Sequence, residues 1–167
     1  METTPHEPLS EDEAAAAAEI GRRFAGGEPL GEILGVVAEY LDEVEHRAYE
    51  FYSQGHDEQA ATLARGVMAL DPQRYFPHLL MGDLALRANQ DAQALGHMES
   101  AHALSADDPC IMAKLGEAYL RCGRVADGQQ MLERVVAVLD DENNAHRRRA
   151  LVLLAVLAKA VAQAEQG

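Results

Sequence analysis

The sequence is poor in aromatic residues and in the features that mark membrane-spanning or disulfide-bonded chains. It has no tryptophan, five tyrosines and three phenylalanines. No run of 18 apolar residues occurs, so we expect no membrane-spanning helix. The two cysteines, Cys110 and Cys122, lie on one expected helix, separated by about 18 Å of helical rise, which is too far for a disulfide bond. We therefore expect reduced thiols, as in a cytoplasm.

Positive charge is also scarce. The chain has 14 Lys and Arg residues against 28 Asp and Glu residues, for a formal net charge of -14. A nucleic-acid-binding protein needs a basic surface, and an anionic membrane would repel this chain. The N-terminal residues METTPHEPLSEDE lack the basic and apolar regions of a signal peptide. We expect residues 1–12 to be flexible and the protein to be cytoplasmic, without direct membrane insertion.

Catalytic and metal-binding motifs are missing as well. The seven histidines show no HExxH spacing, the cysteines form no CxxC pair, and Gly26-Gly27 is not followed by the lysine of a phosphate-binding loop. We expect no catalysis, no cofactor and no metal site.

What the chain does contain is a repeat. Three stretches align without gaps, and small residues recur in them every 34 residues. Small side chains at such positions let two antiparallel helices approach closely. Ala48 with Ala60 would make this contact in the first unit and Gly82 with Ala94 in the second. The repeated positions are Ala48, Gly82 and Gly116, then Ala60, Ala94 and Gly128, then Val67, Ala101 and Val135.

Turn residues support the same period. Gly55, Asn89 and Gly123 are predicted to end the first helix of each unit in a left-handed conformation. Pro72 and Pro109 close the connectors between units, because proline cannot continue a helix. The expected boundaries of the three units are residues 41–74, 75–108 and 109–142.

Helices are also expected on both sides of the repeats. Ser10 and Glu13 form a capping box for an alanine-rich helix in an N-terminal region, residues 13–40. Gly26, Gly27 and Pro29 end that helix, and residues 30–54 continue as one helix or two. Asn143 or Asn144 caps a final helix within residues 143–167, which would cover the last repeat.

This period resembles the tetratricopeptide repeat, a helix-turn-helix unit of 34 residues. The resemblance implies an all-α fold, a right-handed superhelical array of three helix pairs with N-terminal helices and a C-terminal capping helix. The third unit has Gly128 where alanine is usual and the second has Ala106 where proline is common, and we expect both departures to loosen their repeats locally.

The repeat family also implies a ligand-binding surface. Its contacts come from set positions of each unit, which line the concave face of the array. An extended peptide with bulky apolar anchors would suit such a groove. The alternative is that the aromatic residues pack only between repeats. The positions with suitable side chains here are Tyr49, Tyr52, Phe76, Leu79, Leu86, Arg87, Leu120 and Arg121.

One class of repeat adaptor is excluded by the same positions. Adaptors that clamp the C-terminal carboxylate of heat-shock chaperones use lysine and asparagine in the groove. The ninth positions here are Tyr49, Asp83 and Glu117, and Lys114 and Lys159 are the only lysines. We expect a carboxylate ligand to be repelled.

A narrower resemblance follows from the order of FAGGEPLGEIL, AYEFYSQG and LDPQRYFPHLLMG. It is similar to the class II chaperones of type III secretion translocators over about residues 23–139. That resemblance implies a bacterial cytoplasmic protein whose groove holds an extended segment of a hydrophobic translocator before export. Many such chaperones pair through their N-terminal helices, so residues 13–37 are expected to form a homodimer or to fold back on the array.

Two other functions stay open at this point. The chain could be a general repeat scaffold for an unrelated complex, or an enzyme. The absence of catalytic motifs disfavours the enzyme, and a neighbouring gene for a protein with paired hydrophobic segments would favour the chaperone over the scaffold.

Overall fold

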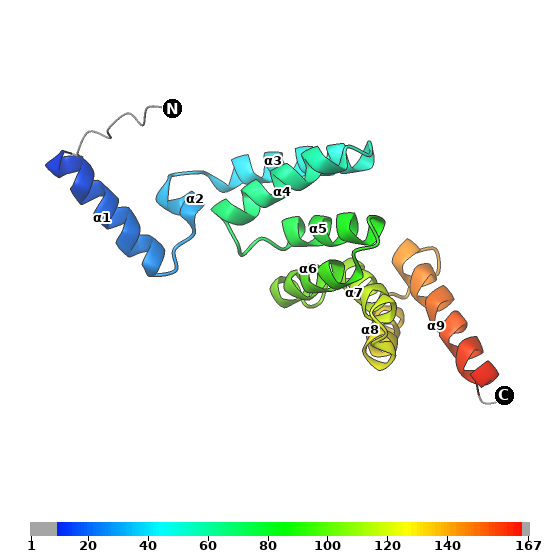
Figure 1. Cartoon of the computed structure of the whole chain (residues 1–167). Helices are drawn as coiled ribbons and strands as arrows, with labels where there is room; N and C mark the ends of the chain where they lie inside the picture. Colours follow the sequence, from blue (N-terminus) through cyan, green and yellow to red (C-terminus); the bar gives the residue numbers. More distant parts are fainter. Residues whose placement is uncertain (1–9, 165–167) are drawn as a thin grey trace, which may run out of the picture.

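A computed structural model describes residues 10–164. Most of the expected flexible segment, residues 1–12, and the last three residues of the expected capping segment lie outside this range. The described residues form helices and no strand, which confirms the all-α prediction (Figure 1). None of these helices is long and apolar enough to cross a membrane. The helices are α1 (Glu11–Ala25), α2 (Leu30–Ile33), α3 (Ala38–Ser53), α4 (Asp57–Leu70), α5 (Tyr75–Arg87), α6 (Asp91–Leu104), α7 (Pro109–Arg121), α8 (Val125–Val138) and α9 (Ala145–Ala164).

Three helix pairs, α3 with α4, α5 with α6 and α7 with α8, stack in chain order as the predicted superhelical array (Figure 1). Each first helix ends two residues before the predicted turn residue. Gly55, Asn89 and Gly123 have φ values of 80°, 57° and 76°. Glycine and asparagine tolerate this left-handed conformation, which reverses the chain within three residues. The prediction of all three turns is confirmed.

Small residues allow the helices of a pair to approach closely. Ala48 and Ala60 are buried in one cluster. In the second pair Ala94 is fully buried, and the three atoms nearest to a Cβ built on Gly82 belong to Met98, with its Cε at 2.7 Å. The long Met98 side chain thus fills the space beside Gly82, which has no Cβ.

Gly128 does not loosen the third pair, contrary to the prediction. A Cβ built on it would lie 2.6 Å from Cδ2 of Leu120 and 2.9 Å from the backbone oxygen of Gly116. The two glycines therefore bring the backbones of α7 and α8 together. Leu120 fills the space beside Gly128, and it can do so because glycine has no side chain.

The N-terminal region contains separate helices. Ser10 and Glu13 form the predicted capping box, and α1 ends just before Gly26. The alternative left open for residues 30–54 is resolved as two helices, α2 and α3, separated by Gly35 at a φ of 71°. Within the predicted dimerisation or fold-back segment, residues 13–37, α1 contacts only α2 among the described helices, whereas α2 packs on α4 of the first pair. This segment therefore folds back on the array through α2 and not through α1.

The last helix covers the third pair, as predicted. The side-chain oxygen of Asn144 accepts hydrogen bonds from the backbone N–H groups of His146 and Arg147, at 2.9 and 3.2 Å. Asn144 is therefore the cap, rather than Asn143. Ala150 of α9 is fully buried against α7 and α8. The predicted covering helix thus closes the apolar face of the array at this end.

Candidate peptide-binding groove

An aromatic cluster lies where the first and second helix pairs meet. Tyr49 and Tyr52 are three residues apart, so they share one face of α3. Phe76, in the first turn of α5, lies beside them. The ring centroids of Tyr49 and Tyr52 are 6.1 Å apart, and those of Tyr49 and Phe76 are 6.4 Å apart with the rings edge to face. The structure therefore brings together the three aromatic residues predicted for the groove.

Arg74 holds Phe76 in this place. Its Nε donates a hydrogen bond of 2.6 Å to Oε1 of Glu45, and its Nη2 pairs with Asp42. The hydrogen bond to Glu45, with that to Asp42, raises the pKa of Arg74 above its ordinary value despite partial burial. The connector before α5 is thereby tied to α3, one repeat away. The repeat pattern alone does not predict this role for Arg74.

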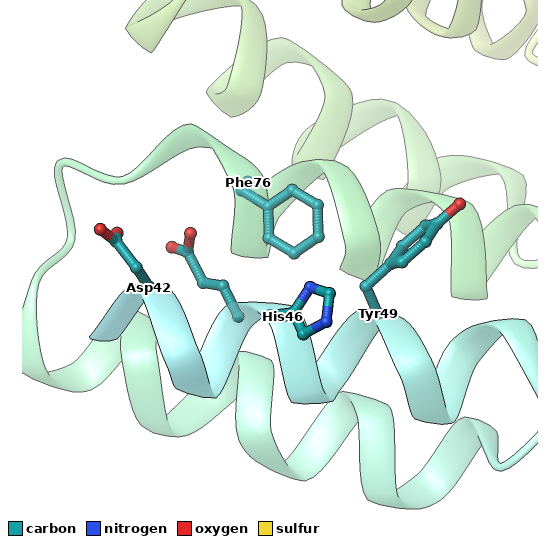
Figure 2. A pocket seen from close by; sticks show the side chains of 5 residues that line it. Asp42, His46, Tyr49 and Phe76 are labelled. Atoms are coloured by element: carbon teal, nitrogen blue, oxygen red, sulfur yellow. The ribbon is translucent and has the colours of Figure 1, made fainter. Parts of the chain in front are cut away.

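Two hollows open on either side of the aromatic cluster. The outer hollow has a volume of about 410 Å³, and Figure 2 shows Tyr49 and Phe76 beside Asp42 and His46 along it. The inner hollow is also about 410 Å³, within the range of roughly 300–1,000 Å³ typical of ligand pockets. It is lined by Tyr49, Tyr52, Phe76, Leu79, Leu80, Asp83, Cys110, Lys114 and His146.

The inner hollow runs across the first helices of all three pairs and reaches α9. Its aromatic end comes from α3 and α5, as predicted for Tyr49, Tyr52, Phe76 and Leu79. Its other end is polar and comes from α5, α7 and the first turn of α9, with His146 as the contribution of α9. This shape can accept an extended chain with a bulky apolar side chain at one end.

The polar end is an ion pair, and neither of its residues is among those that the sequence predicts for the groove. Nζ of Lys114 donates hydrogen bonds of 2.6 and 2.7 Å to the two carboxylate oxygens of Asp83. Burial alone would lower the pKa of Lys114, but the Asp83 carboxylate outweighs it and raises this pKa, so the ammonium stays charged at pH 7. Burial raises the pKa of the neighbouring Cys110 thiol, which therefore stays protonated.

Two of the predicted groove leucines contribute to the core instead of the hollows. Leu86 packs against the buried cluster of Met98, Leu115 and Ala118. Leu120 packs against the cluster around Leu132 and covers Gly128. Neither lines the inner or the outer hollow.

Arg87 and Arg121, which the sequence predicts to line the groove, each form an ion pair with an aspartate of the preceding repeat. Arg87 pairs with Asp57, and its guanidinium lies 4.2 Å from the ring centroid of Tyr52. Arg121 pairs with Asp91 at 2.7 Å. The two arginines are 34 residues apart, and so are the two aspartates. Successive units therefore repeat the same ion pair. These arginines join neighbouring repeats.

The acidic ninth positions are neutralised in the same way. Asp83 pairs with Lys114, and Glu117 accepts hydrogen bonds from Arg149 at 2.9 and 3.2 Å. The repulsion of a carboxylate ligand that the sequence predicts is therefore reduced. Within residues 10–164, no group of three or more His, Cys, Asp or Glu side chains could hold a metal ion.

Comparison with known proteins supports the repeat architecture. Residues 85–152, from the end of α5 into α9, match the family model described as "Tetratricopeptide repeat". No curated protein matches the chain in sequence.

Solved structures share the fold at low identity. A type III secretion system complex from Aeromonas hydrophila has a TM-score of 0.73 at 16% identity, covering 86% of this chain and 97% of that one. The Yersinia enterocolitica type III secretion chaperone SycD in complex with a peptide of the translocator YopD has a TM-score of 0.65 at 16% identity, covering 75% and 97%. The first repeat domain of Spaghetti (RPAP3) bound to the HSP90 peptide SRMEEVD has a TM-score of 0.66 at 18% identity, covering 75% and 96%. At these identities the similarity shows the fold alone.

Proposed function

Because this chain is built from tetratricopeptide repeats, we propose that it is a peptide-binding chaperone, which holds an extended segment of a hydrophobic type III secretion translocator in the bacterial cytoplasm before export. The observation that carries this proposal is the inner hollow. It combines an aromatic end, built by Tyr49, Tyr52 and Phe76, with a course that spans three repeats. An extended peptide can place one bulky side chain at the aromatic end and continue along the face.

The similarity in fold to a chaperone in complex with a translocator peptide is compatible with this client. A general scaffold is the second candidate, and the similarity to a repeat domain bound to an HSP90 peptide favours it. The two candidates differ in the client. Affinity capture from the native cell, read by mass spectrometry, supports the chaperone if the client carries paired hydrophobic segments and supports the scaffold if it does not.

We expect the captured client to protect Cys110 from alkylation. Cys110 lines the inner hollow, whereas Cys122 follows the last residue of α7 and lines neither hollow. Both thiols are free and partly buried, and Cys122 serves as the internal control. N-ethylmaleimide labelling at pH 8, quantified at each cysteine by mass spectrometry, should slow several-fold at Cys110 when the client is bound. Equal labelling of Cys110 with and without a bound client would place the client elsewhere.

We also propose that α1 joins two copies of the chain. No residue of α1 is buried, and Ile20 and Phe24 are 41% and 60% exposed on one face of the helix. This face has no cover among the described residues, because α1 contacts only α2. An apolar helix face of this kind is typical of an interface between copies.

Charged substitutions test this interface. Ile20→Glu with Phe24→Glu should weaken a dimer at least about tenfold, because two carboxylates would be buried without partners. Ala15→Glu with Ala18→Glu adds the same charge on the opposite face and should leave the dimer intact. Analytical ultracentrifugation measures both variants. A wild-type chain that sediments as a monomer at micromolar concentration would exclude the dimer.

A further inference from the structure

The Lys114 ammonium in the inner hollow has unused hydrogen-bonding capacity. An ammonium group carries three donors and no acceptor. Its two short hydrogen bonds to Asp83 engage two of them, and it has no other partner within residues 10–164. Lys114 nevertheless lines the hollow, in the same space as the aromatic rings. One donor is thus left at the place where the proposed client would lie.

We infer that Lys114 donates this hydrogen bond to a backbone carbonyl of the client segment, and that the groove therefore selects an extended, uncharged stretch beside its bulky apolar anchor. This inference rests on the proposed function. It names a determinant of specificity that neither the repeat period nor the aromatic cluster provides. Asp83 acts as the positioning residue, because it fixes the Lys114 ammonium from α5, one repeat away.

Charge decides in favour of a neutral acceptor. The Asp83 carboxylate cancels the positive charge of Lys114, so the pair presents no net charge to a ligand. A carboxylate or a cationic side chain of the client would meet one attractive and one repulsive charge of this pair at nearly the same distance, and would gain little. A carbonyl oxygen satisfies the remaining N–H without either repulsion.

An extended client segment offers Lys114 a backbone acceptor, whereas a helical one does not. In a helix, nearly every carbonyl already accepts a hydrogen bond from the residue four positions later. In an extended segment the carbonyls are unpaired along both edges. A helical client could therefore fill the aromatic end with a side chain but would leave Lys114 without an acceptor. The ion pair thus distinguishes two client conformations that apolar contacts alone do not distinguish.

A backbone ester scan tests this hydrogen bond directly. The probe is a decapeptide selected from a random phage library against the full-length protein, and chosen because it protects Cys110. Replacing one amide at a time by an ester weakens the preceding carbonyl as an acceptor. One ester position should weaken binding to the wild-type protein about fivefold or more. If no position loses more than about twofold, the inference is overturned without any protein variant.

A paired substitution completes the test. Asp83→Leu with Lys114→Met removes the donor and both charges of this partly buried pair. Replacement of even a fully buried ion pair by apolar residues often leaves stability unchanged. We expect at least about tenfold weaker binding of the decapeptide, because a charge-assisted hydrogen bond is lost. The ester position that matters in the wild type should no longer matter in this variant. Binding that is equal or tighter in the more apolar hollow would overturn the inference.

The proposed groove and the proposed role of Lys114 can be disproved separately. If Tyr52→Ala with Phe76→Ala abolishes binding while Asp83→Leu with Lys114→Met does not, the groove stands and the role of Lys114 falls. If no selected peptide protects Cys110, the groove itself is wrong, and the inference falls with it.

Discussion

Replacing Tyr52 and Phe76 together by alanine is expected to weaken client binding at least about tenfold. Both rings line the inner hollow, and each would bury much of its surface against a bulky client side chain. Burying a large apolar side chain contributes roughly 1.5–3 kcal/mol. Truncating a central anchor can cost about 2 kcal/mol or more. Because about 1.4 kcal/mol corresponds to one factor of ten, a tenfold loss is the lower bound. Isothermal titration calorimetry with the captured client measures it.

Stability must be separated from binding in this experiment, because both aromatic side chains pack against the core. They contact the buried cluster of Ala48, Ala60 and Leu80. Leu63→Ala is a matched control, since Leu63 packs against the same cluster but lines neither hollow. It should lower the unfolding midpoint and leave affinity unchanged.

Surface changes on the second helices provide the other control. Gln59→Ala with Gln93→Ala should alter neither affinity nor stability, because both glutamines are exposed. Circular dichroism must show intact helices in every variant. A folded Tyr52→Ala, Phe76→Ala protein with wild-type affinity would show that the aromatic residues do not form the binding site.

The second large effect is expected at Gly128. Gly128→Ala should destabilise the protein by roughly 1–3 kcal/mol, the usual cost of overpacking. A Cβ at this position would lie 2.9 Å from the backbone oxygen of Gly116, and a backbone atom cannot move aside as a side chain can. Helices α7 and α8 would have to separate. This cost outweighs the gain of about 1 kcal/mol that alanine brings to a helix interior.

Two other helical glycines give the opposite expectation. A Cβ built on Gly66 in α4 or on Gly96 in α6 meets nothing within 4 Å. Gly66→Ala and Gly96→Ala should therefore stabilise the protein by up to about 1 kcal/mol. Urea unfolding followed by circular dichroism measures all three variants. A Gly128→Ala protein as stable as these two would contradict the close approach of α7 and α8.

Much of the fold could be predicted because local rules and the repeat period agree. The left-handed conformation that ends a helix depends on the backbone preference of a single residue. The helix ends at Gly55, Asn89 and Gly123 can therefore be predicted from the sequence. The cap of α1 is equally local, since Ser10 and Glu13 are three residues apart. The sequence does not distinguish one helix from two within residues 30–54, because the apolar pattern continues across Gly35.

The candidate site could be predicted only in part, because the position of a residue within a repeat fixes its direction but not its partners. Arg87 and Arg121 point towards the preceding repeat, where aspartates hold them. Leu120 fills the space that Gly128 leaves, which depends on the distance between two helices. One signal was available for Lys114. An acid followed by a base 31 or 32 residues later, as in Asp83 with Lys114 and Glu117 with Arg149, marks a pair between adjacent repeats.

His146 lines the inner hollow, and this limits where the chain can be truncated without loss of the groove. The three helix pairs end with α8, yet the wall of the hollow is completed by the first turn of α9. A fragment cut after residue 142 would keep all three repeats and lose part of the ligand-facing surface. The smallest autonomous binding unit is therefore not a whole number of repeats. A chimera that exchanges client preference between two such proteins must carry the start of α9 along with the repeats.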